Sequence, residues 1–297
     1  MNQKNLFRIH LFLIFAAFSG STALLAAPPP AGVAITIQNA SGTVLAAGTD
    51  PKEVVLTCQH AYQKGDTVVV AGSNGAKFFF VQIDPAVPES LVYTPVGKIT
   101  YPIPFDRERR DGYDPAAFGG ENHSIKARLA TPSELSTYRN VAANALDKRG
   151  QIEYFPHATA NFVTRDDPQF YERNAIDGNK QNSRHGSWPY ESWGPGQRND
   201  AQFKLDFGRE VEIDKVRIFI RCDFPHDTCW KSLTMRFSDG STVEASIEKK
   251  AEGQDFTFPK KKVSWVQLEN LQQISTPLGW AALTEIEVYG SDPARKP

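Results

Sequence analysis

Cysteine, long apolar runs and charge of one sign are all scarce in this sequence. Only 3 cysteines occur among 297 residues, which excludes a small fold held together by many disulfides. After residue 27 no apolar run approaches the roughly 20 residues that a membrane-spanning helix needs. The 33 basic and 34 acidic residues are spread along the chain, without the basic block typical of a nucleic-acid surface. We therefore expect no transmembrane segment in the mature chain and no nucleic-acid partner.

Catalytic signatures are also missing. The sequence has no Gly-x-Ser-x-Gly, no His-Glu-x-x-His and no glycine-rich phosphate loop, and its histidines are scattered. A glycosidase would need two carboxylates about 5–10 Å apart. The nearest candidates are Asp166 with Asp167, Asp114 with Glu121, and Asp223 with Asp227. Because paired acids in loops are common on solvated surfaces, we expect a protein that is not an enzyme.

Residues 1–26 have the layout of a secretory signal peptide. Lys4 and Arg8 precede the apolar run 11–18, and small residues follow it. Cleavage after Ala26 avoids a proline at the first mature position. We therefore expect a secreted, periplasmic or cell-surface protein.

Short β runs separated by turns fill the segment 27–150, which we expect to form an N-terminal β-sandwich domain. The runs are Val33–Ile37, Val54–Leu56, Thr67–Val70 and Lys77–Ile83. Thr131, Pro132 and Glu134 have the pattern of a capping box, and apolar residues continue at helical spacing to residue 145. The sequence therefore predicts one helix over residues 132–144, with a domain boundary after the polar run 147–150.

The segment 151–291 alternates apolar and polar residues more cleanly. The alternating runs are Gln202–Gly208, Val216–Arg221, Leu233–Phe237, Val243–Ile247 and Ile286–Val288. Strands with one apolar face each need a second layer to cover them. The predicted fold class is therefore all-β, with two β-sandwich (jelly-roll) domains and a tail at 292–297.

Several features of the second half occur together in one known family. They are His157–Ala160, Ala175–Asn179, Ala201–Gly208, the strand at Val216, Phe237–Gly240 and Leu283–Gly290. In this order they resemble the discoidin, or coagulation factor V/VIII type C, family of galactose-binding-like jelly rolls. Many bacterial members are carbohydrate-binding modules, so the resemblance implies a jelly roll over about residues 157–290 and a glycan or polysaccharide partner.

The resemblance also implies a structural calcium ion where the Asp-Gly loop meets the last strand, a site built from hard oxygen ligands. The implied ligands are the Asp177 and Glu285 carboxylates, the Asn179 carbonyl, and Asn182 or Ser183. Asn182 stands where the family usually has Thr. A hairpin Asp-Gly and a solvent-facing Glu would give the same pattern without a metal.

Two loops of the second half combine aromatic rings with polar groups, as sugar-binding loops do. Seven of their residues are predicted to bind ligand: His185, Trp188, Tyr190, Arg221, Asp223, His226 and Asp227. Trp193 and Trp230 are instead interpreted as core residues. Because export favours oxidation, Cys222 and Cys229 are predicted to form a disulfide that holds the second loop, and Cys58 to be a buried thiol.

These features predict a secreted, non-catalytic carbohydrate-binding protein that recognises glycans through loops of its C-terminal domain. Two alternatives stay open. One is an adhesion or scaffolding module that contacts protein or lipid, since fold alone does not determine function. The other is a glycan-degrading hydrolase that uses the long loop at residues 101–123.

Overall fold

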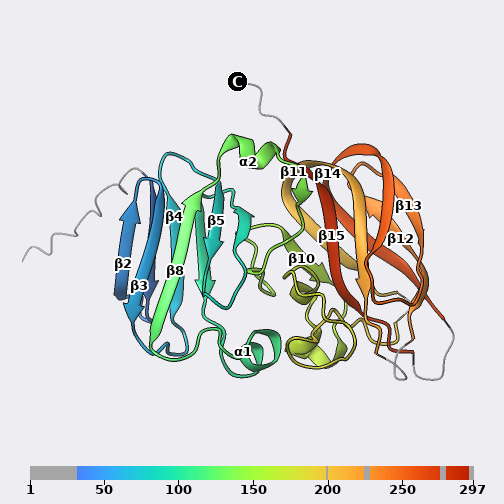
Figure 1. Cartoon of the computed structure of the whole chain (residues 1–297), viewed down its shortest axis with the longest axis horizontal. Coiled ribbons are helices and arrows are strands. Elements are labelled where there is room, and N and C mark those ends of the chain that lie inside the picture. The colour runs from blue at the N-terminus through green and yellow to red at the C-terminus, as the bar shows by residue number, and fades with distance from the viewer. Residues whose placement is uncertain (1–31, 199, 224–227, 275–278, 294–297) are drawn as a thin grey trace, which may run out of the picture.

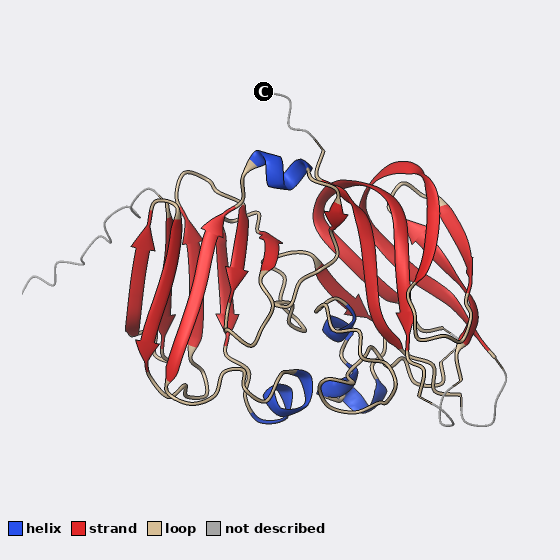
Figure 2. Cartoon of the chain, in the orientation of Figure 1, coloured by secondary structure: helices blue, strands red, loops and turns tan. Residues whose placement is uncertain are grey.

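A computed structural model describes residues 32–293 except 199, 224–227 and 275–278, so the predicted signal peptide lies outside the described residues. The described chain is mostly β structure, with three antiparallel sheets and a few short helices (Figure 2). The strands are β1 (Val33–Gln38), β2 (Val44–Asp50), β3 (Glu53–Gln59), β4 (Thr67–Gly72), β5 (Phe78–Gln82), β6 (Ser90–Tyr93), β7 (Lys98–Pro102), β8 (Asn122–Leu129), β9 (Arg139–Asn140), β10 (His157–Ala160), β11 (Phe203–Ile220), β12 (Trp230–Phe237), β13 (Thr242–Ser246), β14 (Gln254–Gln273) and β15 (Leu283–Ser291). The helices are α1 (Asp106–Gly112), α2 (Pro132–Ser136) and the 3-10 turns η1 (Thr164–Asp166), η2 (Pro168–Phe170) and η3 (Glu172–Ala175).

Two four-stranded sheets form the first half, in the orders β2-β1-β4-β7 and β3-β8-β5-β6. Every second residue of β1 is buried, and the same holds for most of β4 and β8. The two sheets therefore face each other across one apolar core, as alternation along each strand requires. Each of the four β runs predicted here overlaps a strand, namely β1, β3, β4 and β5.

The predicted helix over residues 132–144 is wrong in length. Thr131 makes the expected capping box with Glu134, but α2 ends at Ser136. The Arg139 guanidinium donates to the Leu135 and Thr137 carbonyls at 2.7 and 3.2 Å, and residues 139–140 then pair with β15. The apolar spacing that suggests a longer helix therefore belongs to an extended segment. Tyr138, which the helical interpretation places on the core face, is 53% exposed.

A seven-stranded antiparallel sheet forms the second half, in the order β13-β12-β14-β11-β15-β9, with β10 paired to β11. The runs 202–208 and 216–221, predicted as two strands, belong to the single strand β11. Register shifts between β11 and β14 mark bulges, which bend a sheet and let it curl around its own core. Trp193 and Trp230 are fully buried in that core, as predicted.

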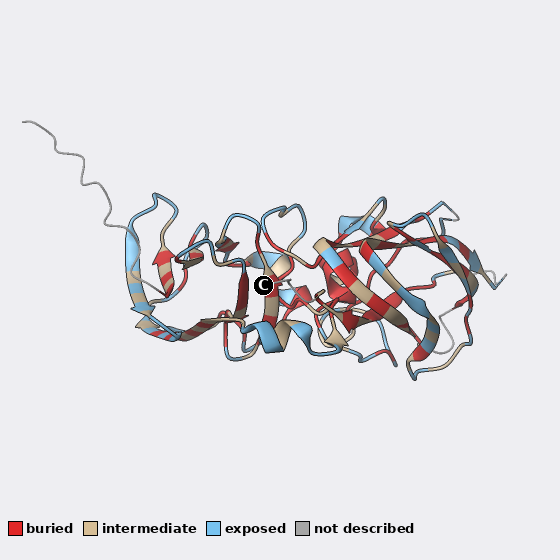
Figure 3. Ribbon diagram, turned by 90° about the horizontal axis from the view of Figure 1, so that it is seen from above, coloured by how far each residue is buried: buried red, intermediate tan, exposed pale blue. Residues whose placement is uncertain are grey.

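The segment between the two sheets contributes to both cores. Val141 and Ala142 pack in the second core, whereas Leu146 and Tyr154 pack in the first. The predicted domain boundary at residue 150 lies within this segment. Buried residues continue from the second sheet into the loops that face the first half (Figure 3).

Arg173 links the two halves through buried hydrogen bonds. Its guanidinium is buried and donates to the carbonyls of Gly112, Ala145 and Asp147 at 3.1, 3.3 and 2.8 Å. A buried guanidinium with this many acceptors costs several kcal/mol to remove, since each carbonyl would lose its donor. The two halves are therefore joined by specific buried contacts as well as by the chain. Within the described residues, no helix has the length and apolar character needed to cross a bilayer.

Candidate functional site

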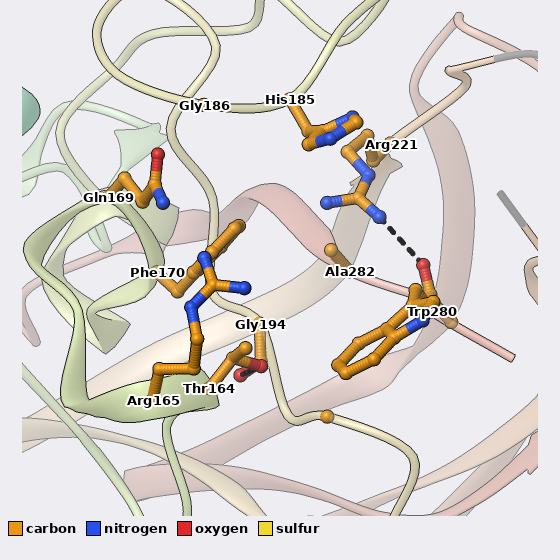
Figure 4. A pocket seen from close by; sticks show the side chains of 12 residues that line it. Thr164, Arg165, Gln169, Phe170, His185, Gly186, Gly194, Arg221, Trp280 and Ala282 are labelled. Carbon is orange, nitrogen blue, oxygen red and sulfur yellow. Dashed lines mark hydrogen bonds between the residues drawn. The ribbon is translucent and has the colours of Figure 1, made fainter. Parts of the chain in front are cut away.

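A cavity of about 570 Å³ opens among the loops at one end of the second sheet. Its walls come from four stretches of chain: η1 and η2, residues 185–196, the residue after β11, and the residues before β15. Figure 4 shows Arg165, Gln169 and Phe170 on one side and His185 and Arg221 on the other, with Trp280 below Arg221. Pockets of about 300–1,000 Å³ are typical of small-molecule sites.

Arg221 is the best-fixed polar group of this cavity. It follows β11, is only 6% exposed, and donates from its guanidinium to the Trp280 carbonyl at 2.8 Å (Figure 4). Its backbone N–H donates to the Ala282 carbonyl at 3.1 Å. Arg221 and the Trp280 segment therefore form one unit, in which a rigid donor fork lies beside an indole ring that is 40% exposed.

His185 lies on the loop that closes the cavity from above in Figure 4. Its Nδ1 contacts an Asp223 carboxylate oxygen, so these two predicted ligand-binding residues are brought together. Across the cavity, the Thr164 hydroxyl donates to the Gly194 carbonyl at 2.7 Å and fastens η1 to the same loop.

Two of the predicted ligand-binding residues lie away from this cavity. Trp188 and Tyr190 do not line the cavity that holds His185 and Arg221. The chain turns toward the first half after Gly186, where the Trp188 N–H donates to the Asp111 carbonyl at 2.9 Å. Trp188 instead borders a separate cavity of about 200 Å³, and the Tyr190 ring lies under the Arg184 guanidinium at 5.8 Å. The predicted residues His226 and Asp227 lie outside the described residues.

Sequence reasoning missed most of the cavity wall: Thr164, Arg165, Gln169, Phe170 and Trp280. One signal was available, because Trp280 follows Gly279 in a short loop just before the last strand, the same setting that drew attention to Trp188. Nothing comparable marks Arg165 or Gln169, which reach the cavity only because η1 and η2 fold under it.

A second cluster, of buried acids, lies where the resemblance implies calcium. Glu285 is fully buried, and neither of its carboxylate oxygens meets a hydrogen-bond donor at suitable geometry. Burial, then the charge of Asp177, raises the pKa of Glu285 well above its ordinary value. Burial raises the pKa of Asp177 to about 6, and burial with the Asp177 charge raises the pKa of Glu191 to about 8. A buried carboxylate without a hydrogen-bond donor, such as that of Glu285, favours a bound cation.

The remaining implied calcium ligands are placed unequally. Asn179 lies beside the acids and donates from its side-chain amide to Glu191 at 2.8 Å, which makes Glu191 a member of the cluster that sequence reasoning missed. Asn182 uses its side-chain amide to hold the carbonyls of Ile220 and Ala251 at 3.0 and 2.7 Å, and Ser183 is exposed. Among the described residues no three His, Cys, Asp or Glu side chains are arranged to chelate a metal by themselves. A hard cation here would therefore also take backbone carbonyl oxygens.

The predicted disulfide between Cys222 and Cys229 is not present in the structure, where both residues are buried thiols. Their backbones are fastened to different segments. The Cys222 N–H donates to the Asn182 carbonyl at 2.7 Å, and the Cys229 carbonyl accepts from the Ile274 N–H at 2.9 Å. Cys58 is a partly buried thiol, and burial raises its pKa.

A family model described as "Domain of unknown function (DUF7402)" matches residues 156–289, which hold both the cavity and the acidic cluster. No curated protein matches the chain.

Several solved carbohydrate-binding modules are similar to about half of the chain. Chitosan-binding module 1 of a chitosanase/glucanase from Paenibacillus sp. IK-5 is 19% identical, with 51% of this chain and 98% of that chain covered and a TM-score of 0.35. The family 32 module of C. perfringens NanJ, solved with galactose, is 17% identical, with 44% of this chain and 91% of that chain covered and a TM-score of 0.35. A fucose-binding module of Streptococcus pneumoniae is 16% identical, with 52% of this chain and 98% of that chain covered and a TM-score of 0.36. The fold of the C-terminal half is the one that its own sheet shows, seven antiparallel strands around one apolar core.

Proposed function

We propose that this protein binds carbohydrate, without cleaving it, in the cavity between Trp280 and Arg221. The observation that supports the proposal is the pairing of a half-exposed indole with a fixed guanidinium in a cavity of about 570 Å³. A sugar ring has apolar C–H faces and a rim of hydroxyls. The indole suits the faces, and the guanidinium, His185 and Gln169 suit the rim.

The lining of the cavity favours binding over hydrolysis. None of the described lining residues is an Asp or Glu, whereas glycosidic cleavage uses two facing carboxylates. Two acids contact lining residues from outside the cavity: Asp223 contacts His185, and Asp167 accepts hydrogen bonds from Gln169 and from Arg107 of α1.

Calcium held by Asp177, Glu285 and neighbouring carbonyls is part of the proposal. The Asp177 loop runs on to His185, and Glu285 follows the Trp280 segment by a few residues. A cation between the loop and the last strand would therefore fix two of the four stretches that form the cavity. Export by the predicted signal peptide is also proposed, and N-terminal sequencing of the secreted protein tests it.

A glycan array with the calcium-loaded mature protein tests this function, with galactose, fucose and chitotriose among the probes. Trp280→Ala should weaken binding to any hit by about tenfold or more, since a buried aromatic contact is worth about 1–2 kcal/mol. Trp188→Ala is the matched control, because it removes a second partly exposed indole outside the cavity. If Trp188→Ala abolishes glycan binding and Trp280→Ala does not, the binding site lies at Trp188 and not in this cavity.

Two outcomes would replace the proposal with an alternative. Release of reducing sugar from a hit would make the protein a hydrolase. Binding to cells or lipid vesicles with no glycan hit would favour an adhesion or scaffolding module.

A further inference from the structure

The first half of the chain contacts the wall of the cavity through α1. This helix packs against η2, and it lies at the lower edge of the molecule between the two halves (Figures 1 and 2). Phe170 is the last residue of η2 and also lines the cavity. Contacts made by α1 are therefore one step away from the ligand-facing groups.

One contact of α1 holds the Arg165 and Gln169 side of the cavity. The Arg107 guanidinium donates to one oxygen of Asp167 at 2.7 Å. The other oxygen of Asp167 accepts from the Gln169 amide at 3.2 Å and lies 3.5 Å from the Arg165 guanidinium. The Asp167 side chain is 7% exposed, so it is a shielded hub between one residue of the first half and two residues of the cavity wall.

A second contact of α1 holds the opposite wall. The Asp111 carbonyl accepts the Trp188 N–H at 2.9 Å, and its carboxylate accepts the Ser187 hydroxyl at 3.2 Å. These residues follow His185 and Gly186 directly. The Arg107 Nε also lies 3.4 Å from the Asp111 carboxylate, so one side chain connects the supports of both walls.

We infer that α1 is a clamp that sets the shape of the cavity, with Arg107 as a positioning residue for glycan binding. The inference rests on the proposed function and gives the first half of the chain a role in it. Charge-assisted hydrogen bonds fix geometry more strongly than neutral ones. Removing Arg107 leaves Asp167 to draw on Arg165 and Gln169 alone, and both groups then turn from the cavity toward Asp167.

The test compares Arg107→Gln with Lys64→Gln in the full mature protein. The Arg107 side chain is 56% exposed, so its replacement leaves the core intact. Lys64 is the matched control, because it pairs with Asp106 at the start of α1 and also loses one positive charge. Hydrogen exchange without ligand should become faster at residues 164–170 in Arg107→Gln only, with no change at residues 280–282. Unchanged exchange at 164–170 overturns the clamp.

Binding adds a second arm that separates this inference from the proposed function. Arg107→Gln should weaken a glycan hit by about five- to tenfold, Arg107→Lys should restore part of that affinity, and Gln169→Ala should cost less in the Arg107→Gln background than alone. Additive losses overturn the positioning role even if glycan binding stands. If the array gives no hit, the proposed function fails, and the exchange arm still decides whether α1 clamps the loops.

Discussion

Replacing Glu285 by glutamine should destabilise the protein in calcium but not in a chelator. Glu285 is fully buried, and its pKa is raised well above its ordinary value, chiefly by burial, so without a cation burial favours the neutral acid. Glutamine is close to that neutral acid in shape and polarity. A bound cation needs the carboxylate, and a ligand that binds only the folded state stabilises by about 2.7 kcal/mol at one hundred times its dissociation constant.

The same cluster predicts how stability depends on pH without calcium. Burial raises the pKa of Asp177 from 3.8 to about 6 and, with the charge of Asp177, that of Glu191 from 4.5 to about 8. Both folded-state pKa values lie above the unfolded ones. The free energy of unfolding that these two protonated acids contribute is therefore fully present below about pH 4 and is lost as the pH rises toward 8. At 1.36 kcal/mol per pH unit, each group costs about 3 kcal/mol at pH 7, and their mutual repulsion prevents simple addition. Calcium should remove this dependence.

Thermal melts at about pH 5 and pH 8, each with EDTA and with excess calcium, make the measurement. A loss of about 3 kcal/mol corresponds to a Tm lower by roughly 6–12 °C for a domain of this size. Glu252→Gln, which replaces an exposed acid, is the control and should leave all four Tm values unchanged. The reasoning is refuted if Glu285→Gln lowers Tm equally in both media, or if EDTA leaves the wild-type Tm unchanged at pH 8.

Three further predictions follow from packing and chemistry. Gly208→Ala should cost more than about 2 kcal/mol in urea unfolding, because φ is +64° and a Cβ would lie 2.3 Å from an aromatic ring atom, whereas Gly240→Ala, at φ +84° with open space, should cost about 1 kcal/mol. Alkylation of the unreduced, denatured protein should modify Cys222 and Cys229 as well as the third cysteine, and a mass gain of only one adduct would show that they pair. Arg173→Met should cost about 3 kcal/mol or more, because three carbonyls lose their donor, and a Tm within a degree or two of wild type would contradict that role.

The sequence predicted those parts of the fold that depend on local pattern. Alternation located β1, β12 and β15, and the capping box located the start of α2. It did not show the full length of β14, because three lysines at 260–262 interrupt the apolar pattern. Lys262 instead lies mid-strand, 3.7 and 3.9 Å from Glu212 and Glu210. That partner strand lies about fifty residues earlier, so local pattern gives no sign of it.

The candidate site divides in the same way. Composition drew attention to both loops, and His185 and Arg221 do meet at one cavity. Trp188 has the same local setting as Trp280, with glycine and proline nearby, yet only Trp280 faces the cavity. The difference is the hydrogen bond to Asp111, a residue more than seventy positions away, and the fold alone determines it.

The pairing of β9 with β15 constrains the order in which the chain can fold. The Val288 N–H donates to the Asn140 side chain across a separation of 148 residues. The Asp292 carboxylate accepts hydrogen bonds from the guanidinium groups of both Arg139 and Arg209. Because β15 is the last strand, residues 139–140 have no strand partner until nearly the whole chain is available. Contacts of such long range slow folding. A chain that is synthesised N-terminus first would therefore complete its first sandwich early, and would dock it on the second only when the final strand is available.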